Sequence, residues 1–76
     1  MINRCTAVPP YLQLAAILRH QIETGELAAG SRLPTILDLG AAYELATPTV
    51  RKALAVLKDE GLVVGVGGYG TFVAEP

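Results

Sequence analysis

Apolar residues recur at helical spacing in two segments of the chain, and each segment predicts an amphipathic helix that buries one side. The first segment follows the proline pair 9–10 and ends at Gly25, a residue type that commonly follows the last turn of a helix. Its apolar stripe consists of Tyr11, Leu14, Ala15, Leu18 and Ile22. The second segment covers residues 47–58, and its stripe consists of Val50, Ala53, Leu54 and Leu57.

A shorter helix is predicted between these two segments. Thr35 and Asp38 have the spacing of a capping box, in which a hydroxyl and an acid each bond a backbone amide at the start of a helix. This helix is expected to reach about Tyr43 and to turn Ile36 and Leu39 inward.

The connector to the next helix is expected to comprise only residues 44–46. Thr47 is the expected N-cap of that helix and Pro48 its first residue, because a hydroxyl can accept a first-turn amide and proline needs no amide partner there. Two short helices joined by so short a connector predict a helix-turn-helix, whose second helix ends before Gly61.

The pattern changes after Gly61. Residues 62–64 and 71–73 are β-formers, and the segment 65–70 between them contains four glycines. This predicts a hairpin, or wing, over residues 62–74, and a very short strand is expected over 31–33. The expected fold class is therefore mainly α with a small β-hairpin: a winged helix-turn-helix of three helices plus wing. Residues 1–9 are expected to form a flexible N-terminal arm, and residues 10–76 the domain.

Composition limits the class of protein. The chain has 76 residues, of which 51% are hydrophobic and 17% charged, and it contains one histidine and one cysteine. It is long enough for one globular domain and contains no run that could span a membrane. Its first residues lack the apolar centre of a signal peptide, so a cytoplasmic location is expected. Without a set of catalytic or metal-ligating side chains, no enzymatic activity, cofactor or metal site is expected.

Charge along the third helix suggests a partner. Arg51, Lys52 and Lys58 lie off its apolar stripe, and residues 45–58 contain no acid. Thr49 and Arg51 can present donors to a phosphate or a base edge, which is typical of a DNA recognition helix. An ordinary amphipathic helix with a solvated charged side explains the same stretch equally well. The net charge of −1 counts against nucleic acid, although all seven acids lie outside this window.

From about position 10 to position 74 the chain resembles the N-terminal winged helix-turn-helix domain of the GntR family of bacterial transcription regulators. The resemblance is carried by residues spread in order along the chain. They are Tyr11, Gln13, Leu14, Leu18, Ile22, Gly25, Leu27, Gly30, Leu33-Pro34-Thr35, Thr49-Val50-Arg51-Lys52-Ala53-Leu54, Glu60-Gly61-Leu62-Val63, Gly68 and Gly70-Thr71-Phe72-Val73.

The resemblance implies a DNA-binding regulator, such as a repressor, that binds double-stranded DNA sequence-specifically as a homodimer. The helix at about 47–60 would enter the major groove and the wing would lie at its flank. Arg51 is the first choice for reading guanine, and Thr49 and Thr71 would hold phosphates. The full set of DNA-binding residues expected from the resemblance and the cationic helix face is Thr35, Thr47, Thr49, Arg51, Lys52, Gly68, Tyr69, Gly70 and Thr71.

Several cations of the family pattern are missing. Family members usually carry arginine at the positions of Leu37 and Thr47, and basic residues around the wing at the positions of Gly65, Val66 and Tyr69. Reduced affinity and a shallow salt dependence are therefore expected.

Two explanations of the missing cations stay open. One is an altered or weaker operator, helped by cooperative or partner binding, and the other a protein-interaction or assembly module that uses Leu37 and Val56 as outward apolar contacts. A third possible function is that of an architectural DNA partner of a recombinase. GntR regulators also usually carry a C-terminal domain that senses a metabolite and dimerises. No small-molecule effector site is expected within these 76 residues. Dimerisation would then use the first helix, the N-terminal arm or the wing.

Overall fold

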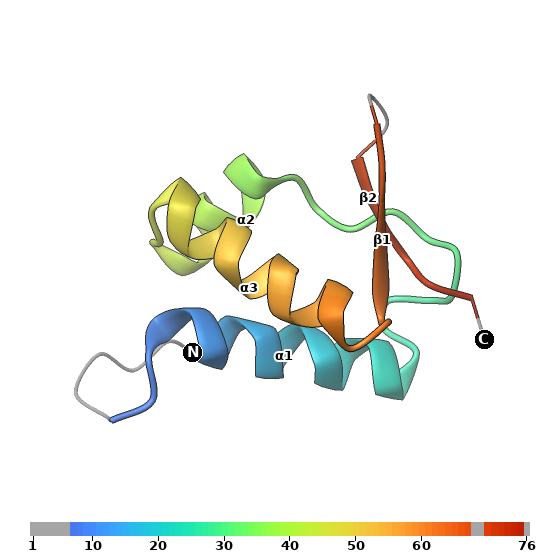
Figure 1. Ribbon diagram of the computed structural model, residues 1–76, viewed down its shortest axis with the longest axis horizontal. Coiled ribbons are helices and arrows are strands. Elements are labelled where there is room, and N and C mark those ends of the chain that lie inside the picture. Colours follow the sequence, from blue (N-terminus) through green and yellow to red (C-terminus); the bar gives the residue numbers. More distant parts are fainter. Residues whose placement is uncertain (1–6, 68–69, 76) are drawn as a thin grey trace.

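The computed structural model describes residues 7–67 and 70–75. Three helices precede a hairpin, and the elements are α1 (Pro10–Thr24), α2 (Ile36–Tyr43), α3 (Thr47–Asp59), β1 (Val63–Val66) and β2 (Gly70–Val73). In Figure 1, α1 lies along one side of α3, while α2 and the hairpin lie towards opposite ends of α3. The predicted fold class, a winged helix-turn-helix of three helices plus wing, is confirmed. No helix in the described ranges is long and apolar enough to cross a membrane.

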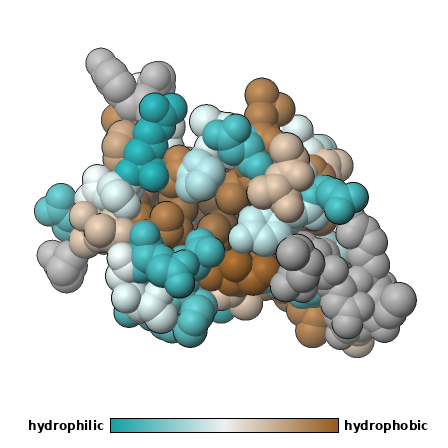
Figure 2. Space-filling view, turned by 180° about the vertical axis from the view of Figure 1, so that it is seen from behind, coloured by the Kyte–Doolittle hydropathy of each residue, from teal (hydrophilic) through white to brown (hydrophobic). Residues whose placement is uncertain are grey.

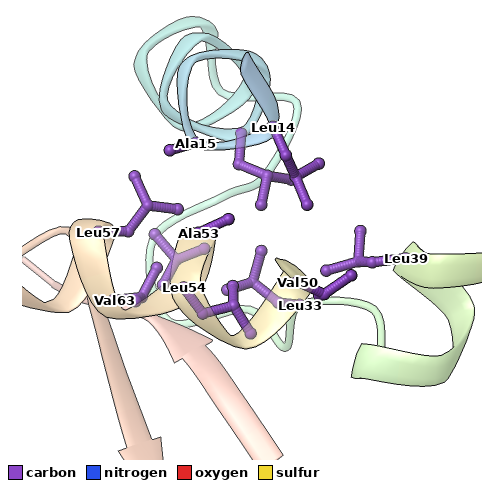
Figure 3. Close-up of a cluster of buried hydrophobic side chains, with 11 residues drawn as sticks. Leu14, Ala15, Leu33, Leu39, Val50, Ala53, Leu54, Leu57 and Val63 are labelled. Atoms are coloured by element: carbon purple, nitrogen blue, oxygen red, sulfur yellow. The ribbon is translucent and has the colours of Figure 1, made fainter. Parts of the chain in front are cut away.

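The core is built around the apolar stripe of α3. Figure 3 shows Leu14 and Ala15 of α1 directed towards Ala53 and Leu57 of α3. The whole predicted stripe of α3 is buried, together with three residues of α1 and single residues from the loop, α2 and both strands. These buried residues are Leu14, Ala15, Leu18, Leu33, Leu39, Val50, Ala53, Leu54, Leu57, Val63 and Val73.

One residue of α3 was assigned to the wrong side. Val56 was expected to face outward, but it is partly buried and packs against the core. At about 100° per residue, Val56 lies next to Ala53 at the edge of the apolar stripe, where it still reaches the core. Leu37 does face outward, with 76% of its surface exposed. From behind, the domain shows apolar surface between hydrophilic side chains (Figure 2).

The hydroxyl half of the predicted capping box of α2 is confirmed. The Asp38 amide N–H donates to Thr35 Oγ1 over 3.0 Å, and Thr35 has the extended backbone of an N-cap. The helix ends at Glu44, whose left-handed conformation (φ 55°) turns the chain and lets the Leu45 amide donate to the Gly40 carbonyl over 2.9 Å. The connector 44–46 therefore has the predicted length.

The predicted cap of α3 is wrong by one residue. Ala46 is the N-cap, with extended backbone angles (φ −68°, ψ 151°), and Thr47 is already in the helix. The reason is that the Ala46 carbonyl accepts the first helical bonds, from the amides of Thr49 and Val50 at 3.0 and 3.2 Å. Pro48 therefore occupies the second helical position, where its missing N–H is equally harmless.

These two threonines give a matched pair for a stability test. We expect Thr35→Ala to lower the free energy of unfolding by about 1 kcal/mol, because it leaves the Asp38 amide without its acceptor. Thr47→Ala should change it by less than about 0.5 kcal/mol, since Thr47 caps nothing. Urea denaturation followed by circular dichroism measures both. A larger loss for Thr47→Ala than for Thr35→Ala would contradict the assignment of the caps.

The loop that precedes α2 hydrogen-bonds to the base of the wing. Its strands pair antiparallel from Val63 with Val73 to Val66 with Gly70. Arg32 forms an isolated bridge with Phe72, and the Leu33 amide donates to the Thr71 carbonyl over 2.8 Å. The short strand expected over 31–33 is thus present as a single bridge. It fixes the wing relative to the first turn of α2.

An ion pair joins α1 to the residue that caps the C-terminal end of α3. Arg19 Nε donates to Glu60 Oε1 over 2.8 Å, and Arg19 Nη2 donates to Glu60 Oε2 over 2.7 Å. The hydrogen bonds and the charge of Arg19 lower the pKa of the Glu60 carboxyl below its usual range.

The lowered pKa gives a pH dependence of stability. The contribution of Glu60 is present above the pKa of an unfolded glutamate, about 4.3, and is lost as the pH falls through the lower folded value. We therefore expect wild type to be more stable than Glu60→Gln at neutral pH, and the difference to shrink on acidification below about pH 4. Thermal unfolding of both proteins between neutral and acidic pH measures it. A difference that grows towards low pH would contradict this.

Candidate nucleic-acid interface

The outer side of α3 borders a shallow groove between α2 and the wing. Two adjoining hollows form it, and Ile36, Leu54 and Thr71 line both of them. The remaining lining residues come from the loop before α2, the first turn of α2, the outer side of α3 and the start of β2. They are Arg32, Leu33, Pro34, Thr35 and Leu37 with Gly70 in one hollow, and Arg51, Ala55 and Lys58 in the other. We call this surface the α3 groove.

Arg51 and Lys58 supply cationic charge to the α3 groove. Both are exposed, about one turn and about three turns along α3 from its start at Thr47, and no acid lines their hollow. Within the part of the chain that the structure describes, neither forms an ion pair. Their charges are therefore available to an anion that enters the groove.

Lys52 follows Arg51 in the sequence but does not share its surface. Its Nζ atom lies 4.6 Å from the centroid of the Tyr11 ring, a cation–π distance. This contact directs the side chain towards α1, at the edge of α3, and Lys52 does not line the groove. The structure thus brings Arg51 and Lys58 together and separates Lys52 from them.

The threonines predicted as contacts lie around the same surface. Thr35 and Thr71 line the α3 groove, and the hydroxyl hydrogen of Thr35 remains available because its oxygen acts as the acceptor of the cap bond. Thr47 and Thr49 are half-buried in the first turn of α3. Gly70 begins β2 with a φ of 111°. The predicted contacts Gly68 and Tyr69 lie outside the described residues.

Two cations near the wing were missed as candidate site residues. An ideal Cβ on Gly65 would lie 3.0 Å from Lys58 Nζ, and one on Gly70 would lie 3.0 Å from Arg32 Nε. The side chains of Lys58 and Arg32 therefore lie directly against the two strands of the hairpin. In the sequence, these two cations and the wing glycines are far enough apart that nothing marks them as neighbours. Their contact follows only from the folded structure.

The comparison with protein families identifies one match. The model of the bacterial regulatory proteins of the gntR family matches residues 10–73. Among curated relatives, the transcriptional repressor NagR of Bacillus subtilis is 37% identical over 75 residues, and the histidine utilization repressor of Klebsiella aerogenes is 36% identical over 73. These alignments cover 99% and 96% of this chain but only 31% and 30% of the relatives. The chain thus spans about a third of their length.

Solved structures agree with the family match. The GntR-family transcription factor YtrA from Sulfolobus acidocaldarius superposes with a TM-score of 0.91 at 33% identity, covering 100% of this chain and 80% of that one. The DNA-binding domain of AraR in complex with operator ORX1 superposes with a TM-score of 0.89 at 29% identity, covering 97% and 92%. The non-enzymatic class expected from the sequence is consistent with these relatives. From the family match and the shared winged helix-turn-helix, the chain belongs to the gntR family of bacterial regulatory proteins.

Proposed function

We propose that this domain binds double-stranded DNA sequence-specifically as part of a transcription regulator, with α3 in the major groove and the wing at its flank. The observation that carries the proposal is the pair of unpaired, exposed cations, Arg51 and Lys58, on the outer side of α3. A helix fits the major groove, and cations on its outer side meet the phosphates and base edges there. The DNA-binding domain of AraR, which is similar over most of this chain and was solved in complex with an operator, supports DNA binding by this domain.

Within the proposed complex, Arg51 reads sequence. Its guanidinium can donate two parallel hydrogen bonds to the O6 and N7 atoms of a guanine. Thr35, Thr47, Thr49 and Thr71 donate to phosphates from the rim of the groove. These contacts fix the position of α3 on the duplex, whereas Arg51 distinguishes one base pair from another.

Lys52 is assigned to the wall of the major groove. The Tyr11 ring holds its ammonium group at the edge of α3, on the side of α1. From this edge it can pair with a phosphate but is turned away from the bases. Gly68, Tyr69 and Gly70 are assigned to the wing contact by their resemblance to the family pattern, since glycine lets backbone amides approach phosphates closely.

The oligomeric state is part of the proposal. Most regulators with this motif bind as dimers on two half-sites about one helical turn, roughly 34 to 36 Å, apart. We propose that residues 10–76 form the domain that occupies one half-site, that residues 1–9 form an arm outside it, and that two copies bind a two-fold symmetric operator. A selected site with two inverted half-sites would support this arrangement.

A second candidate function is favoured by one residue. Leu37 exposes 76% of its surface and lines the α3 groove, where an apolar side chain suits a protein partner as well as DNA. In this case the domain is an interaction module that retains the winged fold.

Selection from a random duplex library, followed by salt titration of the selected duplex, separates the two functions. The DNA-binding proposal expects a recovered sequence motif and an affinity that falls with salt, with a log–log slope of about −2 to −4 per domain for the few available cations. The slope is shallow because the wing strands carry no Lys or Arg. Failure to recover any motif, and no retention on DNA even at low salt, would exclude the proposal and favour the interaction module.

A further inference from the structure

The wing lacks cations of its own, yet two cations from other elements lie against it. Neither β1 (Val63–Val66) nor β2 (Gly70–Val73) contains Lys or Arg, and the tip between them contains none in the sequence. A wing without charge cannot hold phosphates by ion pairing. Lys58 from the last turn of α3 and Arg32 from the loop before α2 occupy that place instead.

Lys58 and Arg32 can lie against the hairpin because the strand residues next to them are glycines. A Cβ on Gly65 would approach Lys58 Nζ to 3.0 Å, and a Cβ on Gly70 would approach Arg32 Nε to 3.0 Å, so a Cβ at either position would make the cation give way by a few tenths of an ångström. The same two glycines leave the backbone of each strand uncovered next to the cation. Each position thus pairs a positive charge with an accessible strand backbone, which suits an anion such as a phosphate.

The two cations lie at neighbouring positions of the hairpin. Gly65 pairs with Thr71, and Gly70 pairs with Val66, so the two glycines belong to adjacent rungs of the ladder. Lys58 and Arg32 both line the α3 groove, each in a hollow that Thr71 also lines, and Arg32 also bridges to Phe72.

Both cations are available for an external anion. Among the described residues neither one is ion-paired, since the ion pair found there joins Arg19 to Glu60. Asp38 lines a neighbouring hollow with Arg32 but forms no ion pair with it. Lys58 and Arg32 are both exposed, so a phosphate can reach either without movement of the backbone.

We infer that Lys58 and Arg32 form a phosphate clamp beside the wing strands, and that this clamp replaces the basic wing residues that the sequence lacks. The inference rests on the proposed DNA binding. When the wing lies at the flank of the major groove, the two cations beside its strands meet the phosphates there. The clamp binds the sugar-phosphate backbone, so it adds affinity on every sequence and leaves base discrimination to Arg51.

The test compares Lys58→Gln, Arg32→Gln and the double variant with wild type on two duplexes, the selected one and an unrelated one. Each single variant should reduce the magnitude of the salt slope by about 1, which is about a fourfold smaller fall in affinity between 50 and 200 mM salt. Affinity should fall by the same factor on both duplexes, so the ratio between them should stay constant. Arg19→Gln is the matched control, because it removes a cation that is already paired with Glu60.

A second comparison separates the clamp from a merely structural role. Gly65→Ala makes Lys58 Nζ give way by a few tenths of an ångström at little cost to the fold, because this atom is the end of a flexible side chain. It should slightly weaken binding in wild type but have no further effect in Lys58→Gln. Equal effects in both backgrounds, or wild-type slopes in all Gln variants, would overturn the clamp while leaving the proposed function standing. Absence of DNA binding by wild type would overturn both.

Discussion

Replacing Leu57 by alanine is expected to lower the free energy of unfolding by about 2 to 5 kcal/mol. Leu57 has 0% of its surface exposed and is surrounded by the core residues of α1 and the strands. Removing most of its side chain loses the burial energy and leaves a cavity that the packed helices fill only partly. Proteins of this size are stable by roughly 4 to 11 kcal/mol, so the change consumes a large part of the total.

Leu37→Ala is the matched control for this prediction. It makes the same chemical change at a site that is 76% exposed, and it should alter stability by less than about 0.5 kcal/mol. Guanidinium denaturation followed by circular dichroism measures both variants. Similar losses for Leu57→Ala and Leu37→Ala would mean that α3 does not pack as described.

The second large effect is expected on DNA binding. Arg51→Ala should weaken binding to the selected duplex by about 1 to 3 kcal/mol and relax the preference at one base pair. The reason is that Arg51 is the arginine that α3 contributes to the α3 groove among the described residues. The free energy of unfolding should stay unchanged, since Arg51 is exposed and makes no ion pair among the described residues. Equilibrium binding to the selected duplex measures the loss.

Arg51→Lys separates the contribution of the charge from that of the guanidinium geometry. Lysine keeps the charge but loses the planar pair of donors, so affinity for unrelated DNA should be retained while discrimination is lost. This pattern is the reverse of the one expected for Lys58→Gln, which weakens both duplexes equally. Wild-type affinity of Arg51→Ala for the selected duplex would contradict the role given to Arg51.

Local patterns were enough to predict the elements of the fold. The stripes of α1 and α3, the Thr35 cap and the change of period after Gly61 all depend on residues close together in sequence, and the structure confirms them. The predicted N-cap of α3 was wrong because proline is tolerated at both the first and the second helical position, so Pro48 alone does not fix where the helix starts. Backbone angles at Ala46 decide it.

The arrangement of the cations could not be predicted in the same way. Lys52 is drawn towards Tyr11, 41 residues away in the chain, and Arg32 reaches β2 only because its loop bridges to Phe72. Both contacts require the packed domain. The sequence indicated which residues are charged, whereas the tertiary structure determines which of them share a surface.

The most direct test of the account is a map of amide chemical-shift changes in the labelled domain as the selected duplex is added. The largest changes are expected along the α3 groove, at residues 35–37, on the outer side of α3 around Arg51, and at Thr71 of β2. The exposed side of α1, including Ala16 and His20, should change little. Large changes on that side of α1, with the α3 groove unaffected, would contradict the claim that α3 and the wing contact DNA.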